Sequence, residues 1–198
     1  MIDYVRKIIQ DLLTMVYEYC GVSIIVTLLF LVVWRCAEES SWKEVSKCLI
    51  QQLKEGKWKK RFTVVLYIIF VMQRTLFNRS PWGNPLGNVL GPWGLWVDGG
   101  PNYEMYENIL LFLPLLPLMK ISHVDKLISH FGSLKRWGVL LIPLEVSLVI
   151  EFIQLMTRAG TFQLSDIFYN TLGGVLGSFI YWCVCKISNG RQAHKELK

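Results

Sequence analysis

Long apolar runs alternate with short polar segments along most of the chain. A helix needs about 20 mostly apolar residues to cross the bilayer core, so runs of this length predict membrane spans. Helical spacing and the turn-forming residues between the runs predict an all-α fold, a polytopic integral membrane protein with about five transmembrane helices. We expect these helices over residues 13–34, 62–77, 106–119, 137–156 and 167–187.

The third run is the shortest and contains Pro114 and Pro117. Proline has no backbone N–H and cannot continue a regular helical hydrogen-bond pattern. In a membrane helix, such prolines indicate a kink or a half-span whose freed carbonyl groups find other partners. A re-entrant segment is the open alternative for this run.

Composition agrees with a membrane protein, since 53% of the 198 residues are hydrophobic and mean hydropathy is +0.37. Little of the chain is left for a soluble domain. We divide it into an N-terminal span with a basic cytoplasmic segment (1–61), a membrane domain (62–187) and a basic cytoplasmic tail (188–198). Residues 41–54 have the spacing of an amphipathic helix on the inner leaflet, with a solvated loop helix as the alternative.

The formal net charge of +6 comes from Lys and Arg in a few hydrophilic stretches. The positive-inside rule assigns segments 35–61, 120–136 and 186–198 to the cytoplasm, and an odd number of spans then puts the N-terminus outside. Arg6 and Lys7 argue against that placement. The charge indicates membrane orientation, and we expect no nucleic-acid partner.

The predicted outer loop, residues 78–103, has a different composition, rich in Gly, Pro and Trp, with Arg79 as its strong base. Such a segment cannot form a long helix. With Trp82, Trp93 and Trp96 in it, we predict a turn-rich cap resting on the outer headgroups.

Polar side chains converge on the outer ends of the predicted spans. A carboxylate in the hydrocarbon layer costs on the order of 2.5 to 3.5 kcal/mol, so it is normally paired, hydrated or functional. Residues three, four or seven apart share a helix face, which aligns Glu151 with Gln154 and Arg158 and Asp166 with Asn170. The candidate ligand-binding residues are Arg74, Arg79, Glu104, Glu107, Asn108, Glu151, Gln154, Asp166 and Asn170.

The face that carries Asp166 and Asn170 continues through Gly173 and Gly177. This small-xxx-small spacing lets a neighbouring helix approach closely, and Gly174 is likewise interpreted as a packing residue. The fourth and fifth spans are joined by a short turn, so we expect an antiparallel pair. Their polar faces should meet each other or a shared cavity.

Three interpretations of the polar residues stay open. In the first, they hold helices together, and Arg74 or Arg158 neutralises Glu107 or Glu151. In the second, they line an outward-facing pocket for a lipid headgroup or a peptide moiety. Alternatively, a carboxylate acts as a general base, or Glu107, Glu151 and Asp166 bind a divalent ion. The sequence has no HExxH, GxSxG or CxxC motif. We therefore predict no metal site and no cofactor, and assign no catalytic residue.

Two blocks of sequence resemble the VanZ-like family of bacterial membrane proteins. The first is Glu104–Pro114, in which acidic residues and an asparagine precede an apolar helical run. The second combines Glu151-x-x-Gln154 with Asp-x-x-x-Asn-x-x-Gly-Gly-x-x-Gly over residues 166–177. The resemblance extends over about residues 74–182.

This resemblance implies a multi-pass protein of the bacterial cell membrane. The name-giving member of the family is associated with low-level teicoplanin resistance in Gram-positive bacteria. We therefore expect a non-enzymatic envelope protein that binds a lipid-linked or cell-wall ligand in a polar outer-leaflet pocket and lowers glycopeptide susceptibility. A membrane enzyme acting on a lipid or lipid-linked headgroup and a structural scaffold are the alternatives. The expected partners are the lipid bilayer and that ligand, and the oligomeric state is not predicted.

Overall fold

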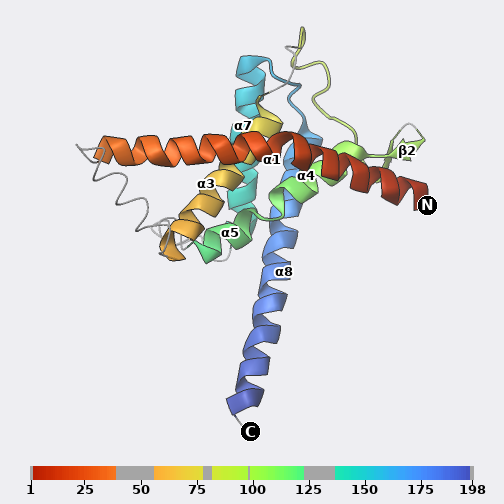
Figure 1. Ribbon diagram of the computed structural model, residues 1–198. Helices are drawn as coiled ribbons and strands as arrows, with labels where there is room; N and C mark the ends of the chain where they lie inside the picture. The colour runs from red at the N-terminus through yellow and green to blue at the C-terminus, as the bar shows by residue number, and fades with distance from the viewer. Residues whose placement is uncertain (1, 39–55, 78–81, 98, 123–136, 197–198) are drawn as a thin grey trace.

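The computed structural model describes residues 2–38, 56–77, 82–97, 99–122 and 137–196 (Figure 1). The described chain is mostly helical, as predicted. The predicted amphipathic segment 41–54 lies outside the described residues. The helices are α1 (Ile2–Glu38), α3 (Gly56–Thr75), α4 (Tyr103–Phe112), α5 (Leu115–Ile121), α7 (Gly138–Thr157) and α8 (Leu164–Glu196), and β1 (Trp96–Val97) pairs antiparallel with β2 (Gly100–Pro101).

Three of these helices are long and apolar enough to cross a membrane, over Val5–Trp34 of α1, Gly138–Thr157 of α7 and Leu164–Ser188 of α8. The predicted count of five spans is not confirmed. The start of α3 is rich in lysine and arginine, which lowers its hydropathy, and α4 and α5 have only 10 and 7 residues. The apolar helices nevertheless indicate a membrane protein.

Helices α7 and α8 lie side by side and antiparallel, as their short connection predicts (Figure 1). Glycines of α8 allow close packing on two sides. A Cβ added at Gly173 would overlap the Ile109 carbonyl group of α4, and one added at Gly174 would overlap the Pro143 ring of α7. The glycines of α8 therefore pack against two neighbouring helices, α4 and α7, rather than against one.

The third apolar run is interrupted at Pro114, as predicted, whereas Pro117 lies within the first turn of α5. Helix α4 ends at Phe112 and α5 begins at Leu115. Pro117 has no N–H to donate to the carbonyl group of Leu113, and that carbonyl faces Gly177 of α8. Neighbouring helices thus cover the backbone of the break, and the Tyr67 hydroxyl of α3 donates to the Leu111 carbonyl at 2.9 Å.

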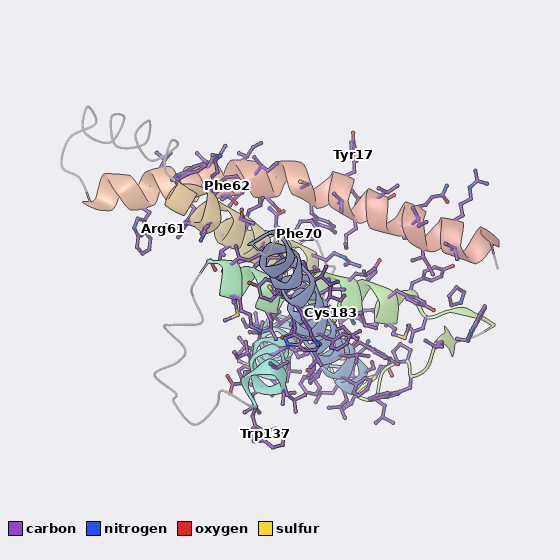
Figure 2. All side chains as sticks on the ribbon, turned by 90° about the horizontal axis from the view of Figure 1, so that it is seen from below. Tyr17, Arg61, Phe62, Phe70, Trp137 and Cys183 are labelled. Carbon is purple, nitrogen blue, oxygen red and sulfur yellow. The ribbon has the colours of Figure 1, made fainter. Side chains whose placement is uncertain are left out.

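Helix α1 runs across the α7–α8 pair instead of alongside it (Figures 1 and 2). It packs mainly on α3, where the Ser23 hydroxyl donates to Gln73 Oε1 at 2.9 Å and Tyr19 meets Phe70 edge to face. Tyr17 projects away from the other helices (Figure 2). The Lys7 ammonium lies 4.9 Å from the centroid of the Tyr103 ring, so the start of α1 lies near the start of α4.

The apolar core joins α3, α4 and α7. Val71, Leu111, Phe112 and Ile150 are buried together. Each of these residues lies within about one helical turn of a polar candidate residue on its own helix. The apolar core and the polar cluster are therefore neighbouring layers of the same helix bundle.

Residues 82–97 and 99–102, here named the cap, fold onto the connection between α7 and α8. The N–H groups of Leu164 and Ser165, in the first turn of α8, donate to the cap carbonyls of Val89 and Leu90 at 2.8 and 3.2 Å. The first turn of a helix has no internal acceptors for its N–H groups, so the cap satisfies two of them. Two further backbone bonds join Trp82 to Arg158 and Phe162 to Pro85, both at 2.9 Å.

The cap is also fixed to α4 and α8. Asn102 caps α4 by accepting from the Met105 N–H at 3.1 Å. Its amide nitrogen donates to the carbonyls of Pro92 and Gly94 within the cap. The Tyr169 hydroxyl of α8 accepts from the Gly94 N–H at 2.9 Å. These bonds place the cap at the end of the bundle where α4 and α8 begin and α7 ends.

Candidate functional site

Arg74 and Glu107 form an ion pair between the last turn of α3 and the second turn of α4. Both side chains are about three-quarters buried, with 24% of each exposed. This is one of the ion pairs expected under the interpretation that the polar residues hold the helices together. It joins α3 to α4 at the cap end of the bundle.

Asn108, the next residue of α4, connects α4 to α8. Its amide nitrogen donates to Asp166 Oδ1 at 2.8 Å, and both residues are half-buried. Because Asp166 lies in the first turn of α8, its negative charge also suits the positive end of the helix dipole.

Asn170, one turn further along α8, connects α8 to α7. Its amide nitrogen donates to the hydroxyl oxygen of Ser147 at 2.9 Å. Ser147 is fully buried and Asn170 is 3% exposed. The predicted contact between the polar faces of these two helices is present, and it uses a serine that the sequence pattern did not single out.

Gln154 connects α7 to α3. Its amide nitrogen donates to the backbone carbonyl of Thr75 at 2.7 Å. Thr75 is the last residue of α3, where carbonyl groups have no partner within the helix. Polar contacts therefore run from α3 to α4, α8, α7 and back to α3. We name the residues of these contacts the polar ring: Arg74, Thr75, Glu107, Asn108, Ser147, Gln154, Asp166 and Asn170.

Glu151 lies one turn from both Ser147 and Gln154 on α7 and is 1% exposed. Its Oε2 accepts from the backbone N–H of Gln163 at 2.9 Å. A carboxylate bound to a backbone N–H gives a strong, charge-assisted hydrogen bond. Glu151 therefore holds the α7–α8 connection, and through it the cap, against the end of α7.

Two atoms of the polar ring have no hydrogen-bond partner among the described residues. They are Gln154 Oε1 and Asn170 Oδ1, and both are buried. A buried acceptor without a donor costs about 1–3 kcal/mol, so such atoms are uncommon in folded proteins. Both atoms can accept a hydrogen bond from a bound group.

The other candidate residues have different positions. Glu104 is exposed in the first turn of α4, and Arg79 lies outside the described residues. Arg158 was expected on the face of Glu151 and Gln154, but it is the left-handed residue that ends α7, with φ at 55°, and its side chain is exposed. Since the helix stops before it, helical spacing does not extend to Arg158.

The sequence analysis did not single out Thr75, Ser147 or Gln163. Thr75 and Gln163 contribute backbone groups, which have no signature in the sequence. Ser147 is a single small hydroxyl within an apolar run. Within the described part of the chain, no three His, Cys, Asp or Glu side chains come together as a possible metal site, so Glu107, Glu151 and Asp166 do not form one donor set.

Comparison with known proteins places this arrangement in a family. The profile of the VanZ/LLP1 family matches residues 19–186, which includes α3 to α7 and most of α1 and α8. Protein VanZ of Enterococcus faecium is similar to the chain, at 29% identity over 94 residues. That similarity covers 48% of this chain and 51% of the relative, so the chain spans about half the length of the curated relative it matches. No solved structure matches the chain. From the extent of the profile match, the chain belongs to the VanZ/LLP1 family.

Proposed function

We propose that this protein acts in the bacterial cell membrane, with its cap end at the outer face, and lowers susceptibility to glycopeptide antibiotics such as teicoplanin. Family membership and the similarity to Protein VanZ of Enterococcus faecium support the proposal. So does the position of the motifs Glu151-x-x-Gln154 and Asp166-x-x-x-Asn170. Three of their residues, Gln154, Asp166 and Asn170, belong to the polar ring, and Glu151 binds the α7–α8 connection at the same end of the bundle.

In this proposal the polar ring binds a lipid-linked or cell-wall ligand. The observation that carries it is the pair of buried, unpartnered acceptors, Gln154 Oε1 and Asn170 Oδ1. Acceptors that lack donors favour a ligand that brings hydroxyl, ammonium or amide N–H groups. Such a ligand would recover the free energy that these buried oxygens otherwise lose.

A structural scaffold is the second candidate. It is favoured because the contacts of the polar ring connect four helices in a closed series. Each of its interhelical contacts joins a different pair among α3, α4, α7 and α8. Interhelical hydrogen bonds in membranes contribute about 0.6 kcal/mol each on average, so together they stabilise the bundle modestly. In the scaffold account, function is lost only when the helices separate.

Antibiotic susceptibility tests the proposal. Teicoplanin and vancomycin inhibitory concentrations are measured in a Gram-positive host with the wild-type protein, the Asp166→Asn variant or an empty vector, at matched membrane abundance. Glu104→Gln is the control, because Glu104 is an exposed carboxylate in the first turn of α4, at the cap end of the bundle. We expect protection against teicoplanin from the wild type and the control, and its loss in Asp166→Asn. An absence of protection by well-inserted wild-type protein would contradict the proposal.

A further inference from the structure

The cap is almost free of charge. Residues 82–102 contain one ionisable side chain, Asp98, and no lysine, arginine or histidine. Exposed loops of water-soluble proteins are usually polar, since charged side chains keep them hydrated. The composition of the cap therefore differs from that of a loop surrounded by water.

Large apolar side chains of the cap are exposed. Their exposed fractions range from 49% to 66%, so about half or more of each residue lies at the molecular surface. Clusters of exposed apolar residues mark a surface that contacts another apolar phase. These side chains are Trp82, Leu86, Leu90, Trp93, Leu95 and Trp96.

The position of the cap identifies that phase. Four backbone hydrogen bonds attach the cap to residues 158–165, which link the two candidate spans α7 and α8. The connection between two antiparallel spans lies at a surface of the bilayer, so the attached cap lies at the same depth. The Trp93 ring also packs against Phe168 and Tyr169, and Phe168 is half exposed on α8. The apolar surface of α8 thus continues onto the cap.

We propose that the cap is a membrane-inserting surface whose partner is the interface between the lipid headgroups and acyl chains at the cap end of the bundle. Tryptophan prefers this layer because its ring is apolar and its N–H can bond to headgroups. Since the cap has no basic side chain, insertion is driven by burial of apolar surface and needs no anionic lipid. This surface is separate from the polar ring, and the inference does not rest on the antibiotic proposal.

The cap inserts as a preformed unit. Gly91 has φ at +69°, and a Cβ there would overlap the Ser165 hydroxyl and lie 2.7 Å from Gln163 Oε1. Backbone bonds, the Asn102 amide and the Tyr169 hydroxyl fix the same segment. Because this support comes from the protein, membrane contact does not have to fold the loop.

Site-directed spin labelling of the full-length protein in vesicles tests this inference. The five native cysteines are replaced by serine, and single cysteines are introduced at Leu90, Trp96 or Val149. Val149 is exposed in the middle of α7 and serves as the lipid-facing reference. The accessibility of each label to oxygen and to a water-soluble nickel chelate is measured in purely zwitterionic vesicles and in vesicles containing phosphatidylglycerol.

We expect the labels at Leu90 and Trp96 to show a depth between a headgroup-labelled lipid and Val149. The depth should be unchanged by phosphatidylglycerol or by high salt. Labels at Leu90 and Trp96 that react with the nickel chelate as freely as a nitroxide in water, while Val149 reports lipid, would overturn the proposal and point to a protein partner or to solvent. Insertion that appears only in anionic vesicles would overturn its charge-independent mechanism.

Discussion

Gly177 of α8 packs directly on the carbonyl group of Leu113, at the break between α4 and α5. In a continuous helix that carbonyl would accept from residue 117, but Pro117 has no N–H. The glycine allows the α8 backbone to approach closely enough for a Cα–H to face the freed oxygen, which is a weak but favourable contact. A proline in one helix and a glycine in another thus form one structural feature.

Gly177→Ala should therefore destabilise the protein. The added methyl group would overlap the Leu113 oxygen, and overpacking of this kind costs about 1–3 kcal/mol. The measurement is thermal unfolding in detergent, followed by the loss of monodisperse protein. Gly21→Ala is the matched control, because no atom lies within 4 Å of its Cβ position. Equal unfolding temperatures for the two variants would contradict the packing described here.

Arg74 and Glu107 should be energetically coupled. The single variants Arg74→Gln and Glu107→Gln each leave one charge partly buried, so each should lower stability, whereas the double variant should lower it by less than their sum. For a contacting pair the expected coupling is about 0.5–3 kcal/mol, and exposure of 24% of each side chain favours the lower end. A double-mutant cycle of unfolding free energies measures it. Strict additivity would show that the ion pair contributes nothing.

Glu151 should tolerate loss of charge better than loss of its acceptor oxygen. Glu151→Gln keeps an oxygen that can accept from the Gln163 N–H, while Glu151→Ala leaves that buried N–H without its partner, at a cost of about 1–3 kcal/mol. We expect Glu151→Gln to unfold closer to the wild type than Glu151→Ala. If the two variants were equally unstable, the negative charge would be the essential property instead of the hydrogen bond.

Gly91→Ala should loosen the cap without unfolding the helices. Alanine is strained at φ of +69°, and its methyl group would collide with Ser165. Limited proteolysis within residues 82–102 should become faster than in the wild type. Gly83→Ala, in the same segment, has open space around the Cβ position and should keep the wild-type rate. Unchanged proteolysis of both variants would show that Gly91 does not fix the cap.

The sequence predicted the polar residues better than it predicted their partners. Helical spacing identified Asn108, Asp166 and Asn170, because ionisable and amide groups stand out within apolar runs. It did not identify the carbonyl of Thr75 or the N–H of Gln163, since every residue has a backbone carbonyl and every residue except proline has an N–H. Three-dimensional contact alone reveals them.

Helix breaks could be predicted from the sequence, whereas the directions of the helices relative to one another could not. The break near Pro114 was predictable because proline acts through local backbone chemistry. The crosswise course of α1 was not, since its apolar run is compatible with any direction relative to α8. The end of α7 was predicted to within one residue, but Arg158 was wrongly assigned to the face of Glu151 and Gln154, because its left-handed conformation gives no signal in the sequence.

Exchange of Asn108 and Asp166 tests most directly whether the polar ring does more than hold helices together. The double variant Asn108→Asp with Asp166→Asn keeps one amide and one carboxylate in contact but moves the charge from α8 to α4. The measurement is teicoplanin susceptibility of the host at matched membrane abundance. We predict that the exchange restores the stability lost in Asp166→Asn without restoring protection. Recovery of both would contradict the ligand-binding account and favour the scaffold.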